Sequence, residues 1–328
     1  MTIVTGQVLR ILPVRELTDG SITQRIVDLI IADEFDYTRV SLWDDKAELV
    51  IRGEINAGDG LCIKNASVSG PQAGGEKRVH AGRYARITKT DAAIVPLRHA
   101  TATKLTVLAV ARPEQGQVCI AGIAADTGDW IRPQGVYERE MDTGGTPLFK
   151  NLCVSSVYLD AWRGRRPRKE DRFFVYGTGV EKELNEAEKQ AFLDRHVDPS
   201  VDDVFKRGRS LGLIKPRITQ VYEEKVRAKK GAKSYEHYLR FNFKDASGRL
   251  YRHWSCRCNA FYHAWNALKE EHRWTYGWRM LRYLRKNETY LAIGLTHSDY
   301  GVRGLEYGAY PLIVGIHTVQ RRNSHRAG

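Results

Sequence analysis

This 328-residue sequence has only five cysteines, and none of them belongs to a C-x-x-C pair. Scattered cysteines in an odd number indicate neither a disulfide framework nor a standard zinc site. No apolar stretch approaches the ~20 residues of a membrane-spanning helix. The opening "MTIVTGQVLR" also lacks the basic start and apolar block of a signal peptide. We therefore expect a cytoplasmic protein without a membrane partner.

The sequence also lacks the short motifs of common enzyme families. The patterns G-x-x-x-x-G-K-[ST], G-x-G-x-x-G and H-E-x-x-H and a nucleophile elbow are all missing. Asp203, Glu223 and Lys225 resemble the acidic-plus-lysine set of metal-dependent nucleases, but 28% of the residues are charged and such a set arises by chance. We therefore predict no catalytic residue, cofactor or metal. A nuclease is the alternative if these three residues converge.

Acidic residues are too few to balance the basic ones, and the imbalance is uneven along the chain. The net charge is +13, with 52 Lys and Arg against 39 Asp and Glu. Residues 1–104 carry 14 basic and 13 acidic side chains, so a balance of +12 falls on residues 105–328. A region this basic favours a polyanionic partner, although charge alone does not separate nucleic acid from an acidic membrane or protein.

Short strand-like runs separated by Gly and Asp turns predict a mainly β protein. Five such runs in the first ninety residues fit an OB-type barrel, a five-stranded Greek-key barrel. Similar runs follow a linker, together with helical segments. We expect about three barrels with a few helices, divided as follows: a first barrel over 1–90, a linker over 91–104, a second barrel with a helical extension over 105–210, a third barrel with inserted helices over 211–319, and a basic tail over 320–328.

The stretch "RVSLW" combines an aliphatic face with an aromatic and cationic one. In an extended strand, Val40 and Leu42 point to one side, while Arg39, Ser41 and Trp43 point to the other. The aliphatic side predicts a core. An indole beside a cation has the chemistry that holds single-stranded nucleic acid, because bases stack on flat rings and cations follow phosphates.

A later hairpin, "YLRFNFK" with "YRHWSCRC", repeats this mixture of side chains. Aromatic and cationic residues on strands also occur without any ligand, but three barrels with the same mixture in a basic chain favour binding. On the first strand the predicted core side holds Leu239, Phe241 and Phe243, and the outer side holds Tyr238, Arg240, Asn242 and Lys244. On the second strand, one predicted face holds Tyr251, His253, Ser255 and Arg257, and the opposite face holds Arg252, Trp254, Cys256 and Cys258.

Two irregular basic runs lie outside these strands, "WRGRRPRK" over 162–169 and "KVRAKKGAK" over 225–233. Glycine and proline in the first run are typical of a loop rather than a helix face. A charged run is often simply solvated, but we expect these two to extend an electrostatic track for a polyanion. The candidate phosphate contacts are Arg163, Arg165, Arg166, Arg168, Lys169, Lys225, Arg227, Lys229 and Lys230.

Residues 4–90 resemble the OB domain of replication protein A and of archaeal single-strand-binding proteins. The resemblance rests on "GQV", the "DG" turn, "IIAD", "RVSLWDDKA" and "AGDGLCIKNASVS", which keep their order and spacing. It implies that Trp43 is a base-stacking residue. Some relatives place a second aromatic residue just after the "NA" of the fourth strand, where this chain has Ser67.

Residues 105–319 resemble the prokaryotic dual OB-domain proteins, a group regarded as nucleic-acid binding. The matching pieces are "CIAG", "DTGDWIRP", "LRFNF" and the closing "YLAIGLT" and "YPLIVGIHTV". Within "DTGDWIRP", Trp130 and Arg132 are candidate ligand contacts.

These observations lead to a non-enzymatic protein that binds single-stranded DNA through tandem OB barrels. Trp43, Arg39 and Lys64 would hold one short stretch of strand, and Tyr238, Arg240, Lys244 and Arg257 would contribute from the third barrel. One alternative is an RNA- or tRNA-binding protein. The other is an adaptor that docks a helicase, a nuclease or a defence protein, in which case the basic surface is incidental.

Overall fold

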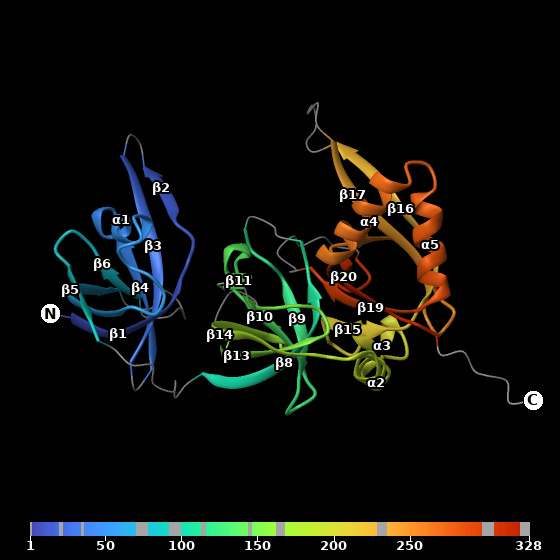
Figure 1. The fold of residues 1–328 in the computed structure, drawn as a ribbon, viewed down its shortest axis with the longest axis horizontal. Coiled ribbons are helices and arrows are strands. Elements are labelled where there is room, and N and C mark those ends of the chain that lie inside the picture. Colours follow the sequence, from blue (N-terminus) through green and yellow to red (C-terminus); the bar gives the residue numbers. More distant parts are fainter. Residues whose placement is uncertain are drawn as a thin grey trace, which may run out of the picture. The chain divides into compact units, whose positions relative to one another are not determined.

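The computed structural model describes residues 2–19, 22–33, 36–69, 78–91, 100–112, 116–143, 146–161, 168–227, 235–296 and 305–321. The protein is mainly β, with a few helices (Figure 1). It divides into two compact units. The first unit comprises 1–103, 156–167 and 171–178, and the second comprises 104–155, 168–170 and 179–328.

The first unit contains a sheet that closes on itself. Its strands follow the order β1-β3-β4-β6-β5, and β5 also pairs with β1. The pairing of β4 with β6 is parallel, and all the others are antiparallel. This is the strand order 1-2-3-5-4-1 of an OB barrel, as predicted. The elements are β1 (Thr2–Ile11), β2 (Arg15–Asp19), β3 (Ile22–Ala32), β4 (Tyr37–Trp43), α1 (Asp45–Ile51), β5 (Gly60–Ser69), β6 (Arg78–Ala81) and β7 (Arg86–Thr90).

The core of this first barrel confirms the face assignment of "RVSLW". Val40 and Leu42 are fully buried among the aliphatic side chains of β3 and β5, while Trp43 on the other face stays half-buried. Helix α1 lies between β4 and β5 in the chain, and it buries Ala47 in the core.

A second barrel closes with the strand order β10-β14-β13-β8-β9, which is again the OB order. Its first strand begins four residues before the predicted start at Leu105. The strands are β8 (Thr101–Val110), β9 (Ile120–Ala124), β10 (Trp130–Gln134), β13 (Cys153–Ala161) and β14 (Asp171–Glu183); the short elements η1 (Glu138–Glu140), β11 (Asp142–Thr143) and β12 (Thr146–Pro147) lie between β10 and β13.

Two helices follow the second barrel, and both begin at side-chain caps. The Asn185 amide oxygen accepts the Glu188 backbone N–H at the start of α2 (Glu186–His196). The Ser200 hydroxyl accepts the Asp203 N–H at the start of α3 (Val201–Phe205). Each cap satisfies a backbone donor that the helix itself leaves unpaired.

The third sheet has the order β15-β19-β20-β18-β17-β16. Only Lys215 and Pro216 separate β15 from β16, so the two ends of this sheet are halves of one bent strand, and the OB order results once more. Across the described ranges, no helix combines the length and apolar character needed to cross a membrane. The elements are β15 (Leu211–Ile214), β16 (Arg217–Arg227), β17 (Tyr235–Lys244), β18 (Leu250–Cys256), α4 (Asn259–Glu271), α5 (Tyr276–Lys286), β19 (Glu288–Leu295) and β20 (Pro311–Val319).

The predicted faces of β17 are confirmed, but those of β18 are partly wrong. Tyr251 lies in the core together with Trp254, rather than outside with His253. The cause is the backbone at His253, which has a φ of 60° and interrupts the register with β17. This bulge places two successive side chains, Arg252 and His253, on the outside, so the alternation shifts by one residue.

The second and third barrels share a core within the second unit. Ala121, Ile123 and Trp130 pack with Leu213 of β15 and Val314 of β20 in a single buried cluster. Every residue of β9 is buried. Both sides of this part of the second barrel are therefore covered, one by its own core and the other by the third barrel.

Burial of His317 on β20 predicts a loss of stability in mild acid. Its Nε2 lies 2.8 Å from the Leu108 carbonyl of β8, and burial lowers its pKa to about 4 from 6.5. A lowered folded-state pKa gives stability that is complete above 6.5 and is lost as the pH falls through about 4. We expect the free energy of unfolding to decrease across this window. Urea titrations of wild type and His317→Gln at several pH values test this, because parallel pH profiles would exclude His317 as the cause.

Candidate nucleic-acid interface

Trp43 stands beside a second flat ring on the outside of the first barrel. The centroids of the Trp43 and His80 rings lie 6.0 Å apart, and the indole Nε1–H donates to His80 Nδ1 at 3.2 Å. His80 on β6 is paired with Ser41 of β4 and with Ser67 of β5. The position of the expected second aromatic residue thus holds a serine, and an imidazole on the adjacent strand lies next to it.

Arg39, predicted as a phosphate contact, is instead engaged with a buried carboxylate. Its Nη2 lies 2.5 Å from Oδ2 of Asp28 on β3, whose side chain is only 1% exposed. Arg15 and Ser41 donate to the same carboxylate. Burial favours the neutral acid, but Arg39 and Ser41 outweigh it and lower the pKa of Asp28. The prediction for Arg39 is wrong, because its charge neutralises Asp28 in the wall of the barrel.

Lys64 is exposed on β5, where it faces Ile3 of β1 and Arg86 of β7. The neighbours of Trp43 are on β3 and β6. Strand pairing therefore does not bring Lys64 next to Trp43, and two exposed cations, Lys64 and Arg86, lie side by side on the barrel instead.

Part of the outer face of the first barrel is covered inside the first unit. Leu9 and Ile30 pack with Val175, and Phe173 stacks on Tyr37 at a centroid distance of 6.2 Å. The Tyr37 hydroxyl donates to Asp160 at 2.7 Å. Trp43, which is half-buried, is not among the residues of this cluster.

Trp130 and Arg132, predicted as ligand contacts, belong to the interior. Trp130 is 8% exposed and lies in the core shared by the second and third barrels. Arg132 is 3% exposed, and its Nη2 donates to Ser210 Oγ at 2.8 Å. Glu170, also buried, accepts from the Ser210 backbone N–H. These predictions are wrong, because barrel packing covers the strands that carry both residues.

The outside of the third barrel groups aromatic rings with cations, as predicted for Tyr238, Arg240 and Arg257. The Tyr238 ring has the Arg240 guanidinium 5.6 Å and the Arg257 guanidinium 5.7 Å from its centroid. Beside it, Tyr222 of β16 meets His253 of β18 edge to face, with 2.5 Å between the Tyr222 hydroxyl and His253 Nδ1. We call Tyr222, Tyr238, Arg240, His253 and Arg257 the β16–β18 outer face.

Hydrogen bonds fix the orientation of this face. Arg240 Nε donates to Glu224 Oε2 at 2.7 Å, so the charge of Arg240 is partly neutralised. The Tyr238 hydroxyl donates to Glu236, and this bond raises the pKa of Tyr238 and keeps the phenol neutral. Lys244 and Lys225, both exposed, lie at opposite ends of the strand pair.

The basic loops contribute little among the described residues. Arg168 donates to the carbonyls of Leu295 and Thr296, so its guanidinium is used inside the protein and the prediction for it is wrong. Lys169 is exposed. The other predicted cations lie outside the described residues, or, for Arg227, have a side chain outside them: Arg163, Arg165, Arg166, Arg227, Lys229 and Lys230.

The nuclease alternative finds no geometric support in the described ranges. No group of three His, Cys, Asp or Glu side chains there could hold a metal. Glu223 binds Lys269 and His237, and these bonds outweigh burial and lower its pKa. Asp203 instead pairs with Arg207. The two carboxylates thus serve separate ion pairs.

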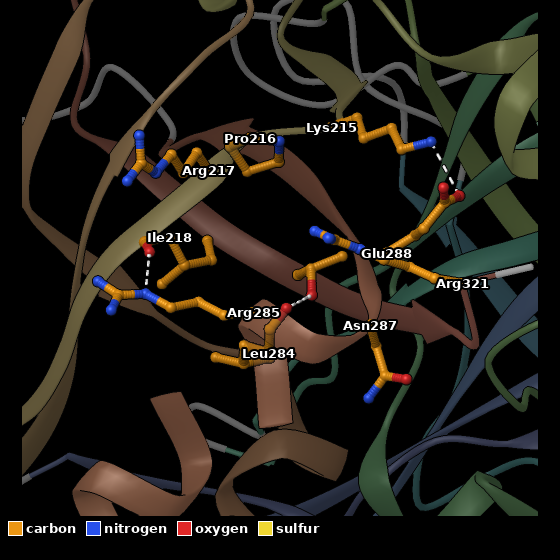
Figure 2. A pocket seen from close by; sticks show the side chains of 10 residues that line it. Lys215, Pro216, Arg217, Ile218, Leu284, Arg285, Asn287, Glu288 and Arg321 are labelled. Atoms are coloured by element: carbon orange, nitrogen blue, oxygen red, sulfur yellow. Dashed lines mark hydrogen bonds and ion pairs between the residues drawn. The ribbon is translucent and has the colours of Figure 1, made fainter. Parts of the chain in front are cut away.

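A pocket of about 660 Å³ opens beside the bend between β15 and β16. Figure 2 shows Pro216, Arg217 and Ile218 on one side of it and Leu284 and Arg285, from the end of α5, on the other. Lys215 and Glu288 form an ion pair at 2.9 Å in its wall. The remaining lining residues are Asn287, Thr289 and Arg321.

Sequence reasoning missed His80, Tyr222 and the pocket. A single histidine in "KRVHAG" has no local signature, and it becomes relevant only because the fifth OB strand pairs with the third. Tyr222 could have been found, since it follows the apolar Val221 in a run that precedes "YLRFNFK" and pairs with it as a strand. The pocket requires residues from three elements that are far apart in the sequence.

Comparison with family models gave no match, and no curated protein matches the chain. Among solved structures, the chain is similar to a replication factor A related protein from Methanobacterium thermoautotrophicum. The identity is 28%, over 30% of this chain and 83% of that one, with a TM-score of 0.25.

A replication protein A heterotrimer bound to single-stranded DNA is also similar, with 9% identity over 97% of this chain and 93% of that one and a TM-score of 0.31. The HINa domain of Ifi202, solved with a 20-base-pair duplex, has 13% identity over 56% and 97% of the two chains and a TM-score of 0.24.

Proposed function

We propose that this protein binds single-stranded nucleic acid, DNA in the first instance, on the outer faces of its first and third barrels. The observation that carries the proposal is the β16–β18 outer face, where the guanidinium groups of Arg240 and Arg257 lie 5.6 and 5.7 Å from the centroid of the Tyr238 ring. A base can stack on such a ring while the flanking cations hold its phosphates.

The positions of these rings within the fold support the same proposal. In OB barrels the second and third strands form the surface that binds oligonucleotides. Trp43 belongs to the third strand of the first barrel, and Tyr238 belongs to the second strand of the third barrel. The corresponding strands of the second barrel are buried, so in this proposal the second barrel has a scaffolding role and does not bind the strand on this face.

Two modules on one chain raise the affinity through effective concentration, so each can be weak. The net charge of +13 favours binding that weakens steeply with salt and depends little on base sequence. The function is non-enzymatic in this proposal, since the rings and cations hold a strand and no described group attacks it.

The test is a fluorescence titration of the full chain with oligo-dT of about 30 nucleotides. Trp43→Ala and Tyr238→Ala should each weaken binding about 5- to 150-fold, because each removes one stacking ring. Lys150→Ala/Lys182→Ala is the control, because these exposed lysines pair with Glu183 and Glu188 and lie on neither proposed binding face. Wild-type affinity in both ring variants would contradict the proposal, and stronger competition by an RNA oligomer of the same sequence would change the ligand to RNA.

A further inference from the structure

Helix α5 presents one face that the third barrel does not use. Its apolar side, with Met280 and Leu284, packs into the core of the barrel. The opposite side carries one indole and four cations and no carboxylate. We call it the α5 outer face: Trp278, Arg279, Arg282, Arg285 and Lys286.

Two tryptophans beside this face are exposed to an unusual degree. Trp278 is 60% exposed, and Trp274, in the turn before α5, is 95% exposed. Tryptophan is highly buried on average, and here the described Trp130, Trp254 and Trp265 follow that rule. The Arg282 guanidinium lies 5.2 Å from the Trp278 ring centroid, so one of these indoles already has a cation over its face.

Three of the four cations of the α5 outer face remain available to a ligand. Within the described ranges, Arg282 and Lys286 form no ion pair within 4.0 Å. Arg279 donates from Nε to the Thr275 hydroxyl at 3.1 Å, and its two terminal nitrogens have no partner among the described residues. Arg285 is anchored, because it donates to the backbone carbonyls of β16 at Ile218 and Thr219.

Arg285 also links this face to the pocket of Figure 2. The same side chain lines the pocket together with Arg217 and Arg321. In the described part of the chain, neither Arg217 nor Arg321 forms an ion pair. The helix and the pocket therefore make one cationic surface, with apolar contacts from Pro216 and Ile218 inside the pocket.

We propose that the α5 outer face, with Trp274, is a second contact for single-stranded nucleic acid and leads the strand into the pocket beside the end of α5. This rests on the proposed function but adds a separate surface. Helix α5 packs on the core side of β16 through Ile218, whereas Tyr222 belongs to the opposite side of that strand.

The chemistry of the surface selects this occupant over two others. An acidic membrane would also attract the cations, but the apolar side of α5 is already in the barrel core and cannot enter lipid. An acidic protein would satisfy the charge without using the two exposed indoles. Bases stack on indoles and phosphates bind arginines, so a strand uses both.

The experiment measures the affinity of the full chain for oligo-dT of about 30 nucleotides at several salt concentrations. Trp274→Ala/Trp278→Ala should weaken binding at least about fivefold for each ring that stacks. Arg279→Ala/Arg282→Ala should lower the salt slope by about 0.7 for each arginine that meets a phosphate. Arg217→Ala should likewise lower the salt slope by about 0.7 if Arg217 meets a phosphate in the pocket.

The matched control is Lys150→Ala/Lys182→Ala, which removes the same charge from two exposed lysines that pair with Glu183 and Glu188. If Tyr238→Ala weakens binding while both α5 double variants match the control, the α5 contact is overturned and the proposed function stands. If only the α5 variants weaken binding, the α5 contact stands and the proposed binding on the outer faces of the barrel strands is overturned. Absence of wild-type binding, or indole-dependent binding to anionic lipid vesicles alone, overturns the inference.

Discussion

Asp28→Ala is expected to destabilise the first barrel by about 3 to 5 kcal/mol, the usual effect of removing one partner from a buried ion pair. The Asp28 carboxylate accepts bonds from Arg15, Arg39 and Ser41 and is almost fully buried. Arg15 is 45% exposed and can turn to water, but the Arg39 side chain is only 20% exposed. The buried Nε of Arg39 has no partner among the described residues, so the Arg39 charge would remain uncompensated in the variant.

The same carboxylate should make the first barrel sensitive to acid. Because the folded-state pKa of Asp28 is lowered, its contribution to stability is complete above 3.8 and is lost as the pH falls below that value. The Asp28→Ala variant should lack this loss of stability below pH 3.8.

Hydrogen exchange measured along the full chain is the suitable readout, since it separates the β3 and β4 amides from those of the second unit. Glu16→Ala is the control. Its partner Arg25 and the Glu16 carboxylate are 49% and 59% exposed, and such surface pairs contribute at most about 1 kcal/mol. Equal protection of β3 and β4 in the two variants would show that Asp28 is not a structural charge.

Local sequence patterns predicted the features that one strand determines by itself, namely which of its side chains face the core and which face outward. The period of two in "RVSLW" and "YLRFNFK" is enough to assign core and outer faces, because the pairing partners impose the same alternation. The assignment failed in β18, where the positive φ of His253 inserts an extra outward residue. A histidine between an arginine and a tryptophan gives no sign of such a bulge.

The errors at Arg39, Trp130 and Arg132 have a different origin. Each is of a residue type that is common on binding surfaces, but packing between distant segments decides its environment. Trp130 and Arg132 are covered by elements about eighty to two hundred residues further along the chain. For Arg39 a signal existed, since the single aspartate in the apolar run "IVDLIIA" of β3 predicts a cationic partner on the neighbouring strand.

Gly315→Ala is expected to disrupt the packing of β20 against β8 and to cost about 3 kcal/mol, at the upper end of ordinary overpacking. A Cβ atom at Gly315 would lie 2.0 Å from the Leu108 carbonyl oxygen and 3.1 Å from the Ala292 Cβ. The first of these is a backbone atom, which cannot move aside as a flexible side chain would. The Leu108 carbonyl also interacts with His317, so any shift would disturb a second buried contact.

Gly277→Ala in α5 provides a control of opposite sign on the same barrel. A Cβ there would meet only Trp265 Cη2, at an ordinary 3.8 Å, and alanine favours a helix over glycine by about 0.5 to 1 kcal/mol. In thermal unfolding of the full chain, we expect Gly315→Ala to lower the Tm of the second unit by roughly 6 to 12 °C and Gly277→Ala to raise it by a few degrees. An unchanged Tm in Gly315→Ala would mean that β8 and β20 do not approach each other closely in solution, and the buried core assigned to Trp130 would lose its basis.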